Sequence, residues 1–155
     1  MRNWASAAHP NHNQITDLQL ISMLETCILE VITLPLSNVV VEIKKLLANI
    51  KTNQISEKEA KQIASFCIDL PLEKINTLTD GLFSIYTRLN TTTKTRQNIR
   101  FLIPFLWDRL DETTRYSFST KYARFVANND KKQAKLAREF LETVSGKSYI
   151  PDIVI

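Results

Sequence analysis

The chain has 155 residues, of which 44% are hydrophobic and 23% charged, a composition typical of one folded globular domain. It contains 2 glycines, and because β-hairpins need glycine at turn positions with positive φ, this scarcity argues against a β fold. The formal net charge of +4 is uneven, since residues 1–90 carry 8 Lys and Arg against 9 Asp and Glu, whereas residues 91–155 carry 12 against 7. We therefore expect a single all-α domain over residues 1–155, with its basic excess in the C-terminal part.

Neither a membrane span nor a secretory signal is predicted. No stretch reaches the roughly 18 uncharged apolar residues of a spanning helix, and the first residues lack an apolar signal core. Cys27 and Cys67 lie far apart within apolar helical patterns, which is typical of buried, reduced thiols rather than of a disulfide framework. We expect a cytoplasmic protein that does not contact a membrane.

Apolar residues recur at helical spacing in seven segments along the chain. Helices are expected to begin at about Asp17, Asn38, Glu57, Leu72, Thr95, Glu112 and Lys131. The starts are indicated by capping residues, such as Ser56 with Glu59 at the spacing of a capping box and Asp111 before the sixth helix. Asp17 is assigned to the first turn of its helix, where the helix dipole favours a negative charge.

Two positions interrupt the helical patterns. Asp80-Gly81 is expected to split or bend the fourth helix, because glycine destabilises a helix interior. Pro104 is expected to kink the fifth helix or to begin its second half, since proline cannot donate to the carbonyl four residues back. The first helix should stop before Pro35, and Gly146 should end the last.

Short links between the helices predict that consecutive helices are antiparallel neighbours. Residues 37–146 then form either a layered array of α-hairpins of HEAT type or a compact bundle, and uniformly short helices favour the array. Residues 147–155, which contain Pro151, form a tail that is expected to lie extended against a groove or to stay mobile. The core of the C-terminal half is expected to contain Phe101, Phe105, Phe118, Phe125 and Phe140.

The polar stretch TTTKTR, residues 91–96, precedes an expected helix start, where free backbone N–H groups attract anions. Lys94 and Arg96 lie in this stretch and Arg100 follows one turn later. These three cations are the candidate residues for binding an anion or a nucleic acid. The alternative is that the threonines serve ordinary capping and loop functions.

Aromatic residues accompany the cations of the C-terminal half, among them Trp107, Tyr116 and Tyr122. Cations with aromatic rings are typical of surfaces that bind single-stranded nucleic acid, because bases stack on the rings. Helical proteins also place aromatic residues in their cores at the same spacing. Without a base-reading element, we expect nucleic-acid binding to be at most weak, non-specific and sensitive to salt.

The opening residues RNWASAAH bring together an arginine, an asparagine and a histidine. In a helix, Arg2 and His9 are about two turns apart and project from about the same face. A guanidinium can neutralise a phosphate that gains charge, and an imidazole can move a proton to or from a ribose oxygen. Asn3 could orient either group. These residue types suit cleavage of a phosphodiester without a metal.

At Arg2, Asn3 and His9 the chain resembles the HEPN superfamily, all-α proteins of prokaryotic defence and toxin systems. The resemblance implies metal-independent RNA cleavage by a dimer in which both motifs face a shared cleft. In the family, helices precede the motif helix, whereas Arg2 is the second residue of this sequence. Residues 1–33 are therefore predicted to be a truncated HEPN-like segment whose catalytic groups are not held in place.

His9 and His12 are three residues apart, but Pro10 between them disrupts the helical turn that would let them share a metal. We expect neither a metal nor a cofactor. The sequence favours a non-enzymatic helical interaction module, the C-terminal part of a larger HEPN-like protein, whose partner is another protein or a second copy in a homodimer. The alternative is a metal-independent endoribonuclease or RNA-binding protein of HEPN type.

Overall fold

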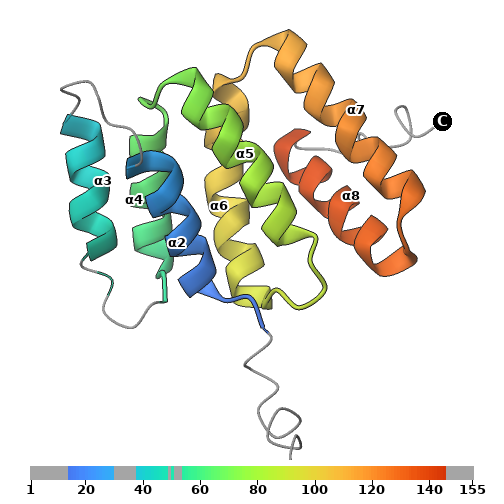
Figure 1. The fold of residues 1–155 in the computed structure, drawn as a ribbon, viewed down its shortest axis with the longest axis horizontal. Coiled ribbons are helices and arrows are strands. Elements are labelled where there is room, and N and C mark those ends of the chain that lie inside the picture. Colours follow the sequence, from blue (N-terminus) through green and yellow to red (C-terminus); the bar gives the residue numbers. More distant parts are fainter. Residues whose placement is uncertain (1–13, 30–37, 49, 51–53, 146–155) are drawn as a thin grey trace, which may run out of the picture.

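The computed structural model describes residues 14–29, 38–48, 50 and 54–145, and the statements below concern these residues. They form α2 (Asp17–Leu29), α3 (Asn38–Ala48), α4 (Glu57–Cys67), α5 (Leu72–Tyr86), α6 (Thr93–Arg109), α7 (Glu112–Asn128) and α8 (Lys131–Ser145) (Figure 1). The prediction of an all-α fold is confirmed. Within the described ranges, β structure is limited to an isolated parallel bridge between Ile15 and Thr91.

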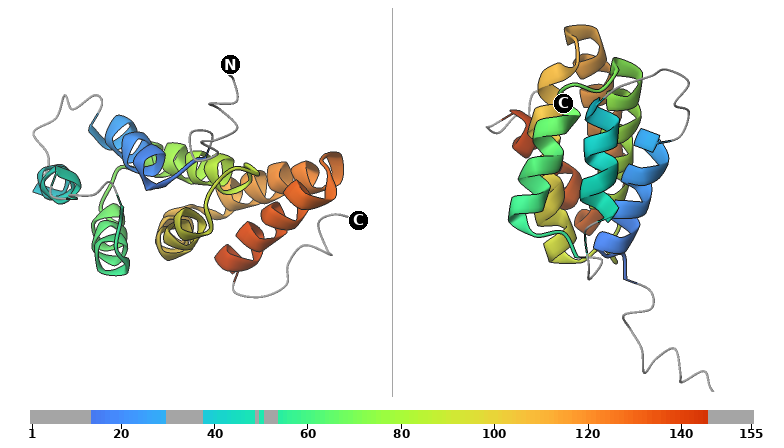
Figure 2. Two further views of the ribbon diagram at one scale, coloured as in Figure 1. Left: turned by 90° about the horizontal axis from the view of Figure 1, so that it is seen from below. Right: turned by 90° about the vertical axis from the view of Figure 1, so that its left-hand side faces the viewer.

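The helices are arranged in two layers. α2, α5 and α7 lie in one layer and α4, α6 and α8 in the other, while α3 packs against α2 and α4 at one end (Figure 2). α5 with α6 and α7 with α8 are consecutive helices that pack closely, as the short links predict. α4 with α5 and α6 with α7 do not pack closely, which corrects the expectation that all consecutive helices are neighbours. The most extensive contact, however, joins α4 to α6, which are not consecutive.

α4 and α6 run in the same direction, and polar contacts join them at both ends. At the N-terminal end, the Lys94 ammonium of α6 donates to the carbonyl of Ile55, just before α4. At the C-terminal end, the Arg109 guanidinium donates to the carbonyls of Ile68 and Leu70, just after α4. The expected antiparallel pairing of consecutive helices therefore omits the principal contact of the second layer, which is parallel.

Local sequence signals place most helix starts correctly. Ser56 and Glu59 form the predicted capping box at the start of α4, and the Asp111 side chain accepts from the backbone N–H of Thr114 in the first turn of α7. α6 begins at Thr93 rather than at Thr95, because the Thr92 side chain is the N-cap. The expected ends at Pro35 and Gly146 and the tail 147–155 lie outside the described residues.

One hydrophobic cluster runs through all seven described helices. Its C-terminal part is aromatic: Phe83 stacks on Tyr122 with ring centroids 3.7 Å apart, and Phe140 meets Phe83 and Tyr122 edge-on. Edge-to-face and offset-stacked rings add to the stabilisation that burial of their surface provides. This aromatic cluster joins α5, α7 and α8.

Phe105 does not belong to the core, contrary to the prediction from sequence. Its side chain is 44% exposed, whereas Phe140 is fully buried and the other three expected phenylalanines are partly buried. The buried face of α6 is formed by Leu102, Ile103 and Leu106, so Phe105 falls on the outer side of the same turn. Helical periodicity gives the spacing of apolar residues but does not select which of two apolar stripes packs inward.

Gly81 does not split α5, which continues through it to Tyr86. A Cβ added at Gly81 would lie 2.9 Å from the sulfur of Met23 on α2. The glycine therefore allows close packing of α2 on α5, a reason that sequence alone does not reveal. Pro104 lies inside α6, which continues to Arg109.

The two cysteines differ in their surroundings. Cys67 is buried, and burial raises the pKa of its thiol to about 12. Cys27 is only half-buried, which corrects the expectation that both thiols are buried.

None of the helices in the described ranges has the length and apolar character needed to cross a membrane.

The contrast between Phe140 and Phe105 gives a stability prediction. Phe140→Ala should lower the free energy of unfolding by about 3–5 kcal/mol, because it opens a cavity in the aromatic cluster. Phe105→Ala should lower it by about 1 kcal/mol or less, because nearly half of that side chain is already in water. Urea unfolding followed by circular dichroism measures both values, and a larger loss for Phe105→Ala would contradict this assignment of the α6 faces.

Candidate functional site

The residues singled out by sequence fall into two groups. Arg2, Asn3 and His9 lie outside the described residues, so the structure does not place them. Lys94, Arg96 and Arg100 lie in the first two turns of α6. Their side chains reach two different places: Lys94 contacts the N-terminal ends of α2 and α4, while Arg96 and Arg100 contact α5 and α8.

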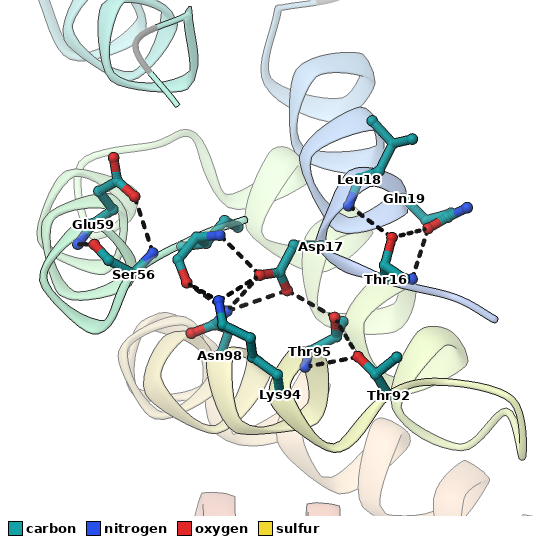
Figure 3. Close-up of polar contacts among 11 residues, drawn as sticks. Thr16, Asp17, Leu18, Gln19, Ser56, Glu59, Thr92, Lys94, Thr95 and Asn98 are labelled. Carbon is teal, nitrogen blue, oxygen red and sulfur yellow. Dashed lines mark hydrogen bonds and ion pairs between the residues drawn. The ribbon is translucent and has the colours of Figure 1, made fainter. Parts of the chain in front are cut away.

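Lys94 belongs to a network around the buried carboxylate of Asp17, which is 2% exposed (Figure 3). One oxygen accepts from the backbone N–H of Ile55 at 2.8 Å and from the Lys94 ammonium at 3.2 Å. The other accepts from the Thr95 hydroxyl at 2.7 Å, and the Asn98 amide lies 3.2 Å from both. A carboxylate so buried is stable only because these donors replace its lost water.

The same donors also hold the segment that precedes α4. The carbonyl of Ile55 accepts from the Lys94 ammonium at 2.9 Å and from the Asn98 amide at 3.1 Å (Figure 3). The Lys94 ammonium is thus bound by a buried carboxylate and a carbonyl, so its positive charge stabilises the fold. The interpretation of Asp17 as a residue that only complements the helix dipole missed this network, since its partners are 38 to 81 residues away.

Arg96 closes the C-terminal end of α5. Its guanidinium donates to the carbonyl of Tyr86 at 2.9 Å and to that of Arg88 at 2.6 Å. Carbonyls at the end of a helix have no partner within it, and a cation there also complements the helix dipole. Partial burial lowers the pKa of Arg96 below its usual value. The guanidinium is therefore held in one orientation at the edge of α5.

Arg100 is held by the fully buried Tyr86. The Arg100 guanidinium donates to the Tyr86 hydroxyl at 2.8 Å, and this hydroxyl donates to a carboxylate oxygen of Glu139 on α8 at 3.0 Å. Arg100 also lies 3.8 Å from the same Glu139 oxygen. Burial raises the pKa of Tyr86, against the opposing hydrogen bond from Arg100, so the phenol remains a donor to Glu139.

Arg96 and Arg100 line a groove of about 370 Å³ between α6 and α8, which we call the α6–α8 groove. Its lining residues are Leu89, Thr93, Arg96, Arg100, Lys132, Lys135, Leu136 and Glu139. Four of these side chains are cations and one is a carboxylate, so the groove has an excess of positive charge. Lys132 and Lys135 are exposed, and neither forms an ion pair with any residue of the described chain.

Sequence analysis did not single out Lys132 and Lys135 as site residues. Their spacing of three residues places both on one face of α8. What brings them to Arg96 and Arg100 is the packing of α8 on α6, a tertiary contact that no local pattern specifies. Four of the basic residues of the C-terminal half are thereby brought to one groove.

The aromatic residues that accompany these cations do not line the groove. Trp107 is 8% exposed and Tyr122 is fully buried, in agreement with their interpretation as core residues. Tyr116 is 73% exposed on α7. The α6–α8 groove therefore has no aromatic ring in its lining on which a base could stack.

Comparisons with known proteins identify no relative. No protein-family model matches the chain, no curated protein is detectably similar to it, and no solved structure matches it. In the described ranges, no three His, Cys, Asp or Glu side chains come together as a group that could hold a metal ion, and both histidines lie outside these ranges. The site is therefore argued from its own geometry.

The Asp17 network predicts unequal effects of two substitutions. Asp17→Ala should lower the free energy of unfolding by about 3 kcal/mol, because it removes the carboxylate that accepts from the buried N–H of Ile55, the Thr95 hydroxyl and the Asn98 amide. Lys94→Met should lower it by about 1 kcal/mol or less, because its side chain is 51% exposed and Asp17 keeps its other donors. Chemical denaturation measures both, and equal losses would show that the ion pair dominates the network.

Proposed function

We propose that the chain is a non-enzymatic helical interaction module that binds an anionic partner through the α6–α8 groove. The observation that carries the proposal is the pair Lys132 and Lys135, which are exposed and unpaired within the described chain and line the same groove as Arg96 and Arg100. Lys94, by contrast, is paired with the buried carboxylate of Asp17 and serves the fold.

The fold supports this proposal by holding part of the groove in place before a partner binds. Arg96 is fixed by two carbonyls of the α5 end, and Arg100 by Tyr86 and Glu139. A binding surface whose side chains are already ordered loses less conformational entropy on association. The two lysines add mobile charge, which raises the local concentration of anions and the rate of encounter at low salt.

A second candidate function comes from the resemblance to the HEPN superfamily. It would use Arg2, Asn3 and His9 for metal-independent cleavage of RNA, and these residues lie outside the described part of the chain. The candidate therefore depends on the sequence motif alone, whereas the interaction module is supported by the geometry of the groove. We prefer the interaction module for this reason.

The groove predicts a localised response to removal of charge. Lys132→Gln/Lys135→Gln should weaken binding of labelled polyglutamate or single-stranded RNA at low salt roughly fivefold, since each exposed charge contributes a modest attraction. The matched control is Lys44→Gln/Lys45→Gln, which removes the same charge from exposed lysines of α3, at the opposite end of the fold from α7 and α8 (Figure 1). Fluorescence anisotropy measures both, and equal weakening by the two variants would refute a function for the groove.

The ribonuclease alternative is tested separately. On the proposed function, we expect the purified chain to show no cleavage of single-stranded RNA that depends on His9. This histidine is the residue to test, because general acid–base transfer would require its imidazole within hydrogen-bonding reach of the proton. The assay incubates the parent and His9→Ala with RNA in the presence of a chelator. Cleavage by the parent that is lost in His9→Ala, and absent from a mock purification, would establish the enzyme and overturn the expectation.

A further inference from the structure

The partner of the α6–α8 groove can be specified further, on the basis of the proposed function. We infer that the groove binds an acidic peptide segment of a partner protein, one that carries an apolar residue among its carboxylates. The argument uses the spacing of the cations, the apolar part of the groove, and the carboxylate of Glu139.

The cations of the groove come in two pairs, each about one helical turn apart. Arg96 and Arg100 are four residues apart on α6, and Lys132 and Lys135 are three residues apart on α8. A helical peptide repeats its side chains at the same intervals, so carboxylates at positions i and i+3 or i+4 match each pair. Charge complementarity therefore favours an acidic segment with this spacing.

The groove also exposes apolar surface. Leu89, between α5 and α6, is 52% exposed, and Leu136 on α8 is partly buried. An apolar side chain of a peptide would remove this surface from water, which is favourable. A phosphodiester backbone has no apolar side chain, and no aromatic ring lines the groove as a surface on which a base could stack. Tyr86 is the aromatic residue beneath the guanidinium groups of Arg96 and Arg100, and it is fully buried.

Glu139 makes the groove unsuitable for a continuous chain of phosphates. Its carboxylate lines the groove beside Arg100 and would repel a negative charge placed next to it. A peptide separates its carboxylates by neutral residues, so a neutral side chain can lie next to Glu139. The volume of about 370 Å³ is near the lower end of the range for ligand sites, about 300–1,000 Å³, and suits a few side chains.

The test compares three labelled ligands at physiological ionic strength by fluorescence anisotropy. The first is an amphipathic peptide of about 15 residues, long enough to form helix, with glutamates at i, i+4 spacing around a leucine. The second replaces each glutamate by glutamine, and the third is a single-stranded RNA of the same net charge. We expect the glutamate peptide to bind most tightly and the glutamine peptide at least about tenfold more weakly.

Three variants of the full chain locate the binding. Lys132→Gln/Lys135→Gln should weaken binding of the glutamate peptide roughly fivefold, and Lys44→Gln/Lys45→Gln should leave it nearly unchanged. Leu89→Ser should weaken it about threefold, because it removes half-exposed apolar surface from the groove. This substitution at an exposed residue tests the apolar contact without removing a charge.

The outcomes separate this inference from the proposed function. If RNA binds as tightly as the glutamate peptide or more tightly, and its binding depends on Lys132 and Lys135, the interaction module stands and the peptide inference is wrong. If binding of neither the glutamate peptide nor the RNA depends on Lys132 and Lys135, the interaction module and the peptide inference are both wrong. Binding of the peptide that is unaffected by Leu89→Ser would refute the apolar part of the inference.

Discussion

The buried carboxylate of Asp17 is the constraint on which the arrangement of the helices depends. It joins the start of α2, the segment before α4 and the first turns of α6, three parts of the chain that are far apart in sequence. Because a charge without water must keep its donors, these three segments cannot shift relative to one another without a large loss of stability. The bridge between Ile15 and Thr91 reinforces the same junction, since the Ile15 N–H donates to Asn90 and its carbonyl accepts from Thr92.

α6 connects this junction to the candidate site. Lys94 and Asn98 lie one turn apart on the side of α6 that faces Asp17, and Arg96 and Arg100 lie one turn apart on the side that faces α5 and α8. The network that fixes the rotation of α6 therefore also orients the two arginines of the α6–α8 groove. Within this short stretch of α6, Lys94 and Asn98 stabilise the Asp17 network, whereas Arg96 and Arg100 line the groove. Their positions around the helix axis determine which of the two functions each residue has.

Features that depend on residues close together in sequence could be predicted from the sequence, and features that depend on contacts between distant segments could not. Helix starts were predictable because Ser56 with Glu59, and Asp111, satisfy backbone groups within three residues of themselves. The exposed position of Phe105, the close packing at Gly81 and the partners of Asp17 depend on contacts between helices, and no local pattern contains that information. For the same reason, Arg96 and Arg100 could be named as candidates from sequence, while their neighbours on α8 could not.

The fold pairs some cations of the C-terminal half with carboxylates and brings four others together in the α6–α8 groove. Within the C-terminal half, Lys94 is neutralised by Asp17 and Lys121 by Asp80, whose carboxylate also accepts from the hydroxyl of Tyr122. These cations contribute to the basic composition but little to the field at the surface, because each is paired. Lys132 and Lys135 have no such partner in the described chain, and they lie beside arginines that the fold holds in place. Because neither lysine side chain takes part in a hydrogen bond or ion pair of the described chain, they are the positions at which binding can be changed while the core and the Asp17 network stay intact.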